Sequence, residues 1–196
     1  LHLRGGIVGG AQWPGASVDH KNNIMYVTSN NIIWESGLSL ISNGKSRAPV
    51  YKSNHRRLLE NNTYPINSPP WGTLNALNLN NGKLLWNVPL GNYDSFKTDN
   101  EDITGTENFG GTTVTRGGIT ITSGTLDKKI HFHDSKNGEL LKSILLPYIG
   151  SAPPSTYSIN GEQFIVVHAT GGWTLRGGYG DLVQTGDAIV GIKLKK

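Results

Sequence analysis

One frame of residues occurs twice in this chain and restricts its fold more than any other feature of the sequence. The frame is ALNLNNGKLLW at 76–86 and FHDSKNGELLK at 132–142, a shift of 56 positions. In each copy a polar turn that contains Asn or Asp and ends in Gly separates two apolar runs. The glycine supplies the positive φ that a tight turn needs, and the Asn or Asp caps the turn. Each copy therefore predicts an antiparallel hairpin.

Residues 105–146 extend the second copy into a larger unit. Short runs that are β-branched or that alternate apolar with polar residues are separated by turns rich in Gly, Asp and Asn, and they lie at 112–115, 119–123, 130–134 and 140–146. Four short strands within about forty residues are typical of one blade of a β-propeller. This unit therefore predicts a complete four-stranded blade.

Similar patterns on both sides of this unit predict an all-β fold, an arc of about three four-stranded antiparallel blades. The blades lie at about 13–90, 108–146 and 151–194, and the last has only three strands. Residues 35–70, which contain four of the prolines, are predicted to form a long irregular insertion at the rim of the first blade. Propeller rings have typically four to eight blades, so an arc of three should be unstable, oligomeric or completed by missing blades.

Composition supports a turn-rich sheet protein and excludes several classes of site. Gly makes up 26 of 196 residues, charged residues make up only 16%, and the net charge is a mild +4. The basic cluster Arg47, Lys52, Arg56 and Arg57 forms no aromatic-basic motif of the kind that binds nucleic acid, so it predicts solvated loops and no nucleic-acid partner. Cysteine is absent, and no stretch approaches the roughly 18–20 apolar residues of a membrane span. We therefore expect no disulfide, no thiolate metal site and no spanning helix in this chain.

Four motifs along almost the whole chain resemble those of a known family. They are WPGASVD at 13–19, PWGTLNAL at 70–77, TGTENFGG at 104–111 and GEQFIVV at 161–167. Their order and spacing resemble the C-terminal part of the pyrroloquinoline quinone (PQQ)-dependent dehydrogenases, the eight-bladed quinoproteins, and most of all the glucose dehydrogenase-like group. The resemblance implies that this arc is part of a longer eight-bladed ring. The first residue is Leu1 rather than Met, which favours a piece of a longer chain or a processed product.

The resemblance also implies an activity. Enzymes of this family oxidise a sugar or alcohol by hydride transfer to PQQ, while calcium polarises a quinone carbonyl and electrons pass to ubiquinone or a cytochrome. They work in the bacterial periplasm, and any attachment to the inner membrane would be made by sequence outside this chain. The family's catalytic Asp, calcium ligands and vicinal disulfide lie in earlier blades and have no counterpart here. We therefore expect part of a cofactor site, without the catalytic base or a metal ligand.

Five residues match positions at the cofactor in this family. Asn30 follows a predicted strand where similar enzymes place an Asn whose amide reaches the quinone oxygens, although an Asn there is also an ordinary turn former. Phe109, Gly110 and Gly111 match a Trp-Gly-Gly sequence at the chamber, and the alternative is a blade-core Phe followed by a turn. Trp173 matches a tryptophan near the cofactor in the methanol-type branch, or else plugs the central funnel.

Other aromatic and polar residues are expected to be structural. Trp86 occupies the docking position of the repeated frame, so we expect it to stack between blades, whereas Lys142 at the same position predicts a weaker contact. His131 and His133 point to one face of a strand. That pair favours the blade surface over a zinc or copper site, because no third ligand has suitable spacing.

Alternative functions remain open at this point. A triad of Ser17, Asp19 and His168 lacks a nucleophile elbow and is disfavoured. A non-catalytic scaffold built from PQQ-like repeats would keep the docking frame but has no reason to keep GTENFGG or Asn30. A sugar-binding or interaction module needs exposed aromatic platforms, for which Trp34 and Trp173 are the candidates.

Overall fold

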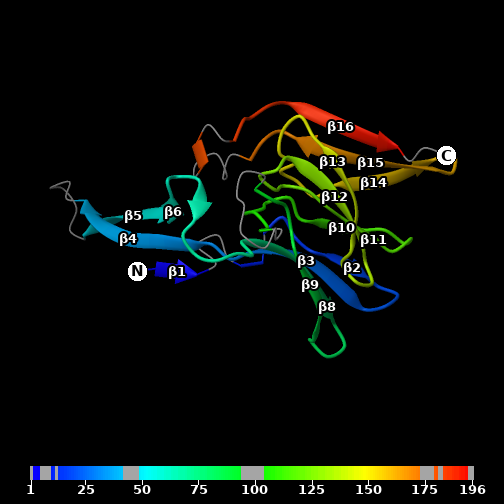
Figure 1. The fold of residues 1–196 in the computed structure, drawn as a ribbon, viewed down its shortest axis with the longest axis horizontal. Coiled ribbons are helices and arrows are strands. Elements are labelled where there is room, and N and C mark those ends of the chain that lie inside the picture. The colour runs from blue at the N-terminus through cyan, green and yellow to red at the C-terminus, as the bar shows by residue number, and fades with distance from the viewer. Residues whose placement is uncertain are drawn as a thin grey trace.

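The computed structural model describes residues 2–4, 10–11, 13–41, 49–93, 104–172, 179–180 and 183–193. Its regular elements are β-strands, which pair antiparallel (Figure 1). No helix among these residues is long and apolar enough to cross a membrane. The predicted all-β fold class, an arc of antiparallel blades, is confirmed.

Three sheets form the blades. The first sheet contains β2 (Ser17–Asp19), β3 (Ile24–Asn30), β8 (Gly72–Asn78) and β9 (Leu84–Pro89). The second contains β10 (Thr112–Val114), β11 (Ile119–Thr122), β12 (Lys129–Asp134) and β13 (Leu140–Leu145). The third contains β14 (Ser155–Ile159), β15 (Glu162–Ala169) and β16 (Ala188–Lys193). In all three sheets the strand order follows the chain order.

The insertion in the first blade is more regular than predicted. β4 (Ile33–Ile41) and β5 (Val50–Arg57) form a long hairpin that extends away from the three blade sheets, with β1 (His2–Arg4) along its edge (Figure 1). The short pair β6 (Leu59–Glu60) and β7 (Tyr64–Pro65) follows. The prediction of an irregular segment was wrong because its prolines lie directly before β5, in the two-stranded β6–β7 pair or after that pair. At such positions a missing N–H breaks no hydrogen bond of the long hairpin.

The connections between strands gather at one end of the blades. Because neighbouring strands are antiparallel, the connections that leave the second and fourth strands of a blade emerge at the same end. Backbone hydrogen bonds join them: Thr106 N–H donates to Leu90 C=O at 2.8 Å, and Gly171 N–H donates to Ile149 C=O at 2.9 Å. The described parts of 31–71, 90–111, 123–128, 146–154 and 170–187 are called the connection face below.

Trp86 joins the first blade to the second, as predicted. Its Nε1–H donates to the backbone oxygen of Ser135 at 3.2 Å, and the Tyr26 hydroxyl donates to the same oxygen at 3.1 Å. The two rings lie 5.8 Å apart between their centroids. Gly138, in the turn that follows Ser135, leaves room for the indole, because a Cβ there would lie 2.8 Å from Trp86 Cε3.

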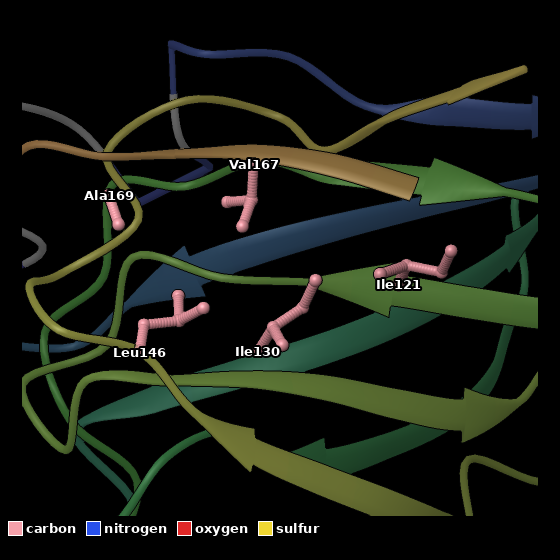
Figure 2. Close-up of a cluster of buried hydrophobic side chains, with 5 residues drawn as sticks. All are labelled: Ile121, Ile130, Leu146, Val167 and Ala169. Atoms are coloured by element: carbon pink, nitrogen blue, oxygen red, sulfur yellow. The ribbon is translucent and has the colours of Figure 1, made fainter. Parts of the chain in front are cut away.

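The second and third blades meet through aliphatic side chains instead. Lys142 is exposed, and the contact is a buried cluster of Ile121, Ile130, Leu146, Val167 and Ala169 (Figure 2). Three of these residues come from the second blade or its exit, and two come from β15. Aliphatic burial therefore takes the place of the aromatic docking seen at the first junction.

Replacing Gly138 by Ala should loosen the junction between the first two blades. Gly138 and Gly82 occupy the same place in the repeated frame, with φ of 78° and 70°, but a Cβ at Gly82 would meet nothing within 4 Å. Both substitutions place an alanine in a left-handed backbone conformation, which is unfavourable. Only in Gly138→Ala would the new Cβ also overlap the Trp86 ring. We expect Gly138→Ala to lower the free energy of unfolding by about 1–3 kcal/mol more than Gly82→Ala, measured by urea unfolding. Equal losses would contradict this role.

Candidate cofactor-binding site

Asn30 is held in a defined orientation on the connection face. It ends β3, and only 5% of its surface is exposed. Its Nδ2 donates to the Asn108 carbonyl at 3.0 Å, while its Oδ1 accepts from the Asn108 backbone N–H at 3.0 Å and from Asn108 Nδ2 at 2.9 Å. A primary amide has two N–H donors, so these bonds use one of them and leave one for another acceptor. The structure thus supports more than a turn-forming role for Asn30.

Asn108 is the partner that sequence reasoning did not assign. Its Nδ2 also donates to the Ser29 carbonyl at 3.3 Å, and its buried Oδ1 has no hydrogen-bond partner among the described residues. A buried amide oxygen without a partner is unusual and costs free energy. The TGTENFGG motif indicated that this stretch is part of the site. It did not indicate the contact with Asn30, because no local sequence pattern reports a partner 78 positions away.

Phe109, Gly110 and Gly111 are accounted for by packing inside the chain. Phe109 lies in a buried cluster with Ile149, Tyr179 and Val183. A Cβ on Gly110 would lie 2.0 Å from the Ser123 carbonyl oxygen, and one on Gly111, whose φ is 68°, would lie 2.8 Å from Pro153 Cγ. Their contact with a cofactor stays a prediction, and Trp173 lies outside the described residues.

A buried ion pair lies next to the Asn30–Asn108 contact. Arg57 Nε lies 2.5 Å from Glu107 Oε2, and Nη2 donates to Oε1 at 3.0 Å. The side chains are 4% and 0% exposed. Burial raises the pKa of Glu107, and the Arg57 guanidinium opposes that rise. The prediction that Arg57 belongs to a solvated basic loop is therefore wrong, because its partner lies 50 positions away in the sequence.

Aromatic rings enclose this ion pair. The Arg57 guanidinium carbon lies 4.4 Å from the centroid of the Trp34 ring and 5.4 Å from that of Tyr179. Burial raises the pKa of Tyr179 and of Tyr93, and Glu107 raises both further. Trp34 itself is only 4% exposed. It is therefore no exposed platform, which removes one of the two aromatic candidates for an interaction module.

The two histidines of β12 are buried between blades rather than on a blade surface. They line a groove of about 440 Å³ between β9 and the β12–β13 pair. His131 Nδ1 lies 2.9 Å from Ser143 Oγ, and Nε2 lies 3.4 Å from Asp127 Oδ2. Among the described residues no three His, Cys, Asp or Glu side chains are placed to hold a metal ion. The surface placement was wrong because β9 of the first blade lies across the groove from β12.

The residues of the disfavoured triad have other partners. Ser17 Oγ lies 2.9 Å from Thr112 Oγ1, in a contact between the inner strands of the first two blades. Asp19 accepts from the backbone N–H of Lys21 at 2.9 Å, which closes the β2–β3 turn. His168 is exposed on β15 of the third blade. Ser17 and Asp19 belong to the first blade and His168 to the third, so the structure gives no support to a triad.

His133 should make the protein sensitive to acid. Burial, and then the nearby His131, lowers the pKa of His133 to about 4, against an ordinary 6.5. The neutral form is favoured in the fold, so its stabilisation is complete above pH 6.5 and is lost as the pH falls toward 4. We expect a loss of up to about 3 kcal/mol over this range.

The measurement is the thermal midpoint of the native protein between pH 7 and 4. His133→Gln, which carries no titrating group, should flatten this profile, whereas the exposed His168→Gln should leave it unchanged. The same acid sensitivity in His133→Gln and in the unmodified protein would show that another group is responsible.

Comparison with known proteins identifies the family. A family model described as PQQ, glucose/ethanol/alcohol dehydrogenase, beta-propeller domain, matches residues 2–165. Over 191 residues the chain is 27% identical to a probable quinate dehydrogenase (quinone) of Xanthomonas campestris pv. juglandis, which covers 85% of this chain and 24% of the relative. Over 135 residues it is 31% identical to the quinoprotein glucose dehydrogenase of Escherichia coli K12, which covers 66% of this chain and 16% of the relative.

Solved structures agree with this match at the level of the fold. A quinohemoprotein alcohol dehydrogenase from Comamonas testosteroni superposes with a TM-score of 0.59 and 20% identity, over 86% of this chain and 23% of that one. A europium-containing methanol dehydrogenase gives a TM-score of 0.61 and 18% identity, over 87% and 27%. The chain thus spans about a quarter of the length of these proteins, or less. Because the family model covers most of its length, this chain belongs to the β-propeller family of PQQ-dependent dehydrogenases.

Proposed function

We propose that this chain supplies one wall of the cofactor chamber in a PQQ-dependent dehydrogenase that oxidises a sugar or another polyhydroxylated alcohol. The observation that carries the proposal is the Asn30 amide. It is buried at the connection face and oriented by three hydrogen bonds to Asn108, with one N–H left for an external acceptor. A neutral donor held in advance in this way suits an oxygen on which negative charge develops.

The described residues fit such a cofactor at Asn30 and Asn108. When bound, PQQ supplies a quinone carbon that accepts a hydride, with oxygens on which charge accumulates. Asn30 would donate its remaining N–H to one of these oxygens, and Asn108 would keep the amide from rotating. The buried Oδ1 of Asn108, which has no partner among the described residues, offers an acceptor beside this donor. Phe109, Gly110 and Gly111 are proposed to support the chamber from behind, and Trp173 to line it.

Calcium does not fit the described residues. This cation takes six to eight oxygen ligands, mainly carboxylates and carbonyls, and no three acidic or histidine side chains gather among the described residues. We propose that the calcium ligands and the catalytic base are supplied by residues other than these. The role of the described residues is to orient the cofactor and to exclude water around it.

The relatives suggest the class of substrate and of electron acceptor. Their names refer to quinate, glucose and, in a Gluconobacter oxydans enzyme that is 35% identical over 111 residues, glycerol. All three molecules carry several hydroxyl groups, so we propose a polyol substrate class that includes glucose-like sugars. A quinone such as ubiquinone, or a cytochrome, is the proposed electron acceptor, and the bacterial periplasm is the proposed compartment.

Removal of the Asn30 donor tests this function. In the native protein, stripped of cofactor and then reconstituted with PQQ and calcium, Asn30→Asp should lower kcat by about 10²-fold with the tested polyols. Asp keeps the oxygen that accepts from Asn108 but lacks both N–H groups, the one proposed to reach the cofactor and the one that donates to the Asn108 carbonyl. Asn80→Asp, in the exposed β8–β9 turn, is the control and should retain full turnover.

Two outcomes would contradict the proposal. Unchanged turnover in a folded Asn30→Asp protein would remove Asn30 from the site. A native protein that binds no PQQ and oxidises none of glucose, quinate and glycerol would favour the non-catalytic scaffold instead.

A further inference from the structure

We propose that Arg57 and Glu107 form a positioning pair that sets the orientation of the Asn30 amide toward the cofactor. This inference rests on the proposed function, because it assigns a cofactor contact to Asn30. The pair itself touches neither cofactor nor substrate in the proposal. It acts through Asn108, the residue that follows Glu107.

The first step in the argument is the closure of the β4–β5 hairpin. Asn30 ends β3, shortly before β4 begins at Ile33, and Arg57 ends β5. Asn30 is bound to Asn108, and Arg57 is bound to Glu107. Two adjacent residues of the connection between blades therefore hold the chain just before the hairpin and at its end.

The second step is the way in which the ion pair fixes the Asn108 backbone. Both the N–H and the C=O of Asn108 bind the Asn30 amide. This N–H belongs to the peptide group that joins Glu107 to Asn108. The carbonyl of the same peptide group accepts a hydrogen bond from the Thr106 hydroxyl at 3.1 Å. On the other side, Phe109 N–H donates to the Gly124 carbonyl at 3.1 Å. The ion pair adds a side-chain anchor at Glu107 to these backbone restraints, so we propose that its loss lets the groups that orient Asn30 shift.

The third step concerns the energetics of a buried ion pair. Desolvation offsets much of the attraction between such charges, so the net gain in stability over an apolar pair is small or negative. What a bidentate Arg–carboxylate pair supplies is geometry, because the planar guanidinium fork fixes both partners. Trp34 and Tyr179 lie against the guanidinium and limit its movement further.

A double-mutant cycle on the native protein separates positioning from general stability. The probe is PQQ itself, titrated into the cofactor-free protein and followed by quenching of tryptophan fluorescence. Glu107→Gln, which preserves shape, and Arg57→Lys, which preserves charge, should each raise the dissociation constant for PQQ by about tenfold. Arg56→Lys is the matched control, because Arg56 is the neighbour in β5 and pairs with Glu35 at the surface, with 74% and 42% of the side chains exposed.

The decisive comparison is made in the Asn30→Asp background. If the pair acts through the Asn30 donor, Glu107→Gln should have no further effect on the dissociation constant there. A persistent tenfold effect would overturn the proposal and make the pair a general support of the fold. Failure of both Glu107→Gln and Arg57→Lys to fold would also overturn it.

The same data distinguish a failure of this inference from a failure of the proposed function. If Asn30→Asp weakens PQQ binding while Glu107→Gln and Arg57→Lys do not, only the positioning role is wrong. If Asn30→Asp leaves PQQ binding unchanged, the cofactor contact is wrong, and the positioning role fails with it.

Discussion

The packing of each blade against the next is the interaction on which the rest of this structure depends. A four-stranded blade has two faces and too little thickness to bury either of them alone, so its apolar residues are covered only by its neighbours. The two junctions between blades are packed differently. Trp86 and Tyr26 dock on the turn around Ser135 at the first, whereas aliphatic side chains around Val167 fill the second.

Close contact between backbone segments also explains the glycines near the connection face. Around Gly110 two segments of the second blade approach until their backbones touch, because a Cβ there would overlap the Ser123 carbonyl. A Cβ on Gly72 would likewise lie 1.8 Å from the Thr106 carbonyl oxygen. At these two positions glycine allows one backbone segment to lie in contact with another. In the proposed function, the polar group that meets the cofactor on this face is the Asn30 amide, which Asn108 orients.

The sequence predicted those parts of the fold that are encoded locally. The hairpins around Gly82 and Gly138 follow from alternation and turn chemistry within eleven residues, and Trp86 was assigned correctly from its place in that frame. The prediction of an irregular segment was wrong for the β4–β5 hairpin, because a proline next to a strand does not prevent that strand from pairing. The Arg57–Glu107 pair and the Asn108 partner of Asn30 join residues 50 and 78 positions apart, and no local pattern reports such contacts.

The contacts that orient the Asn30 amide lie at the base of the β4–β5 hairpin, apart from its distal half. Asn30, just before the hairpin, and Arg57, at its end, are bound to residues 108 and 107, while the distal half extends away from the blades, with Leu38 72% exposed and Tyr51 57% exposed (Figure 1). Its length and its side chains can therefore change without moving the Asn30 amide, provided that both ends stay bound. Because loop closure becomes only slowly more costly with length, the fold tolerates variation there. A fixed base with a freely exposed tip therefore lets the hairpin change while the orientation of the amide is kept.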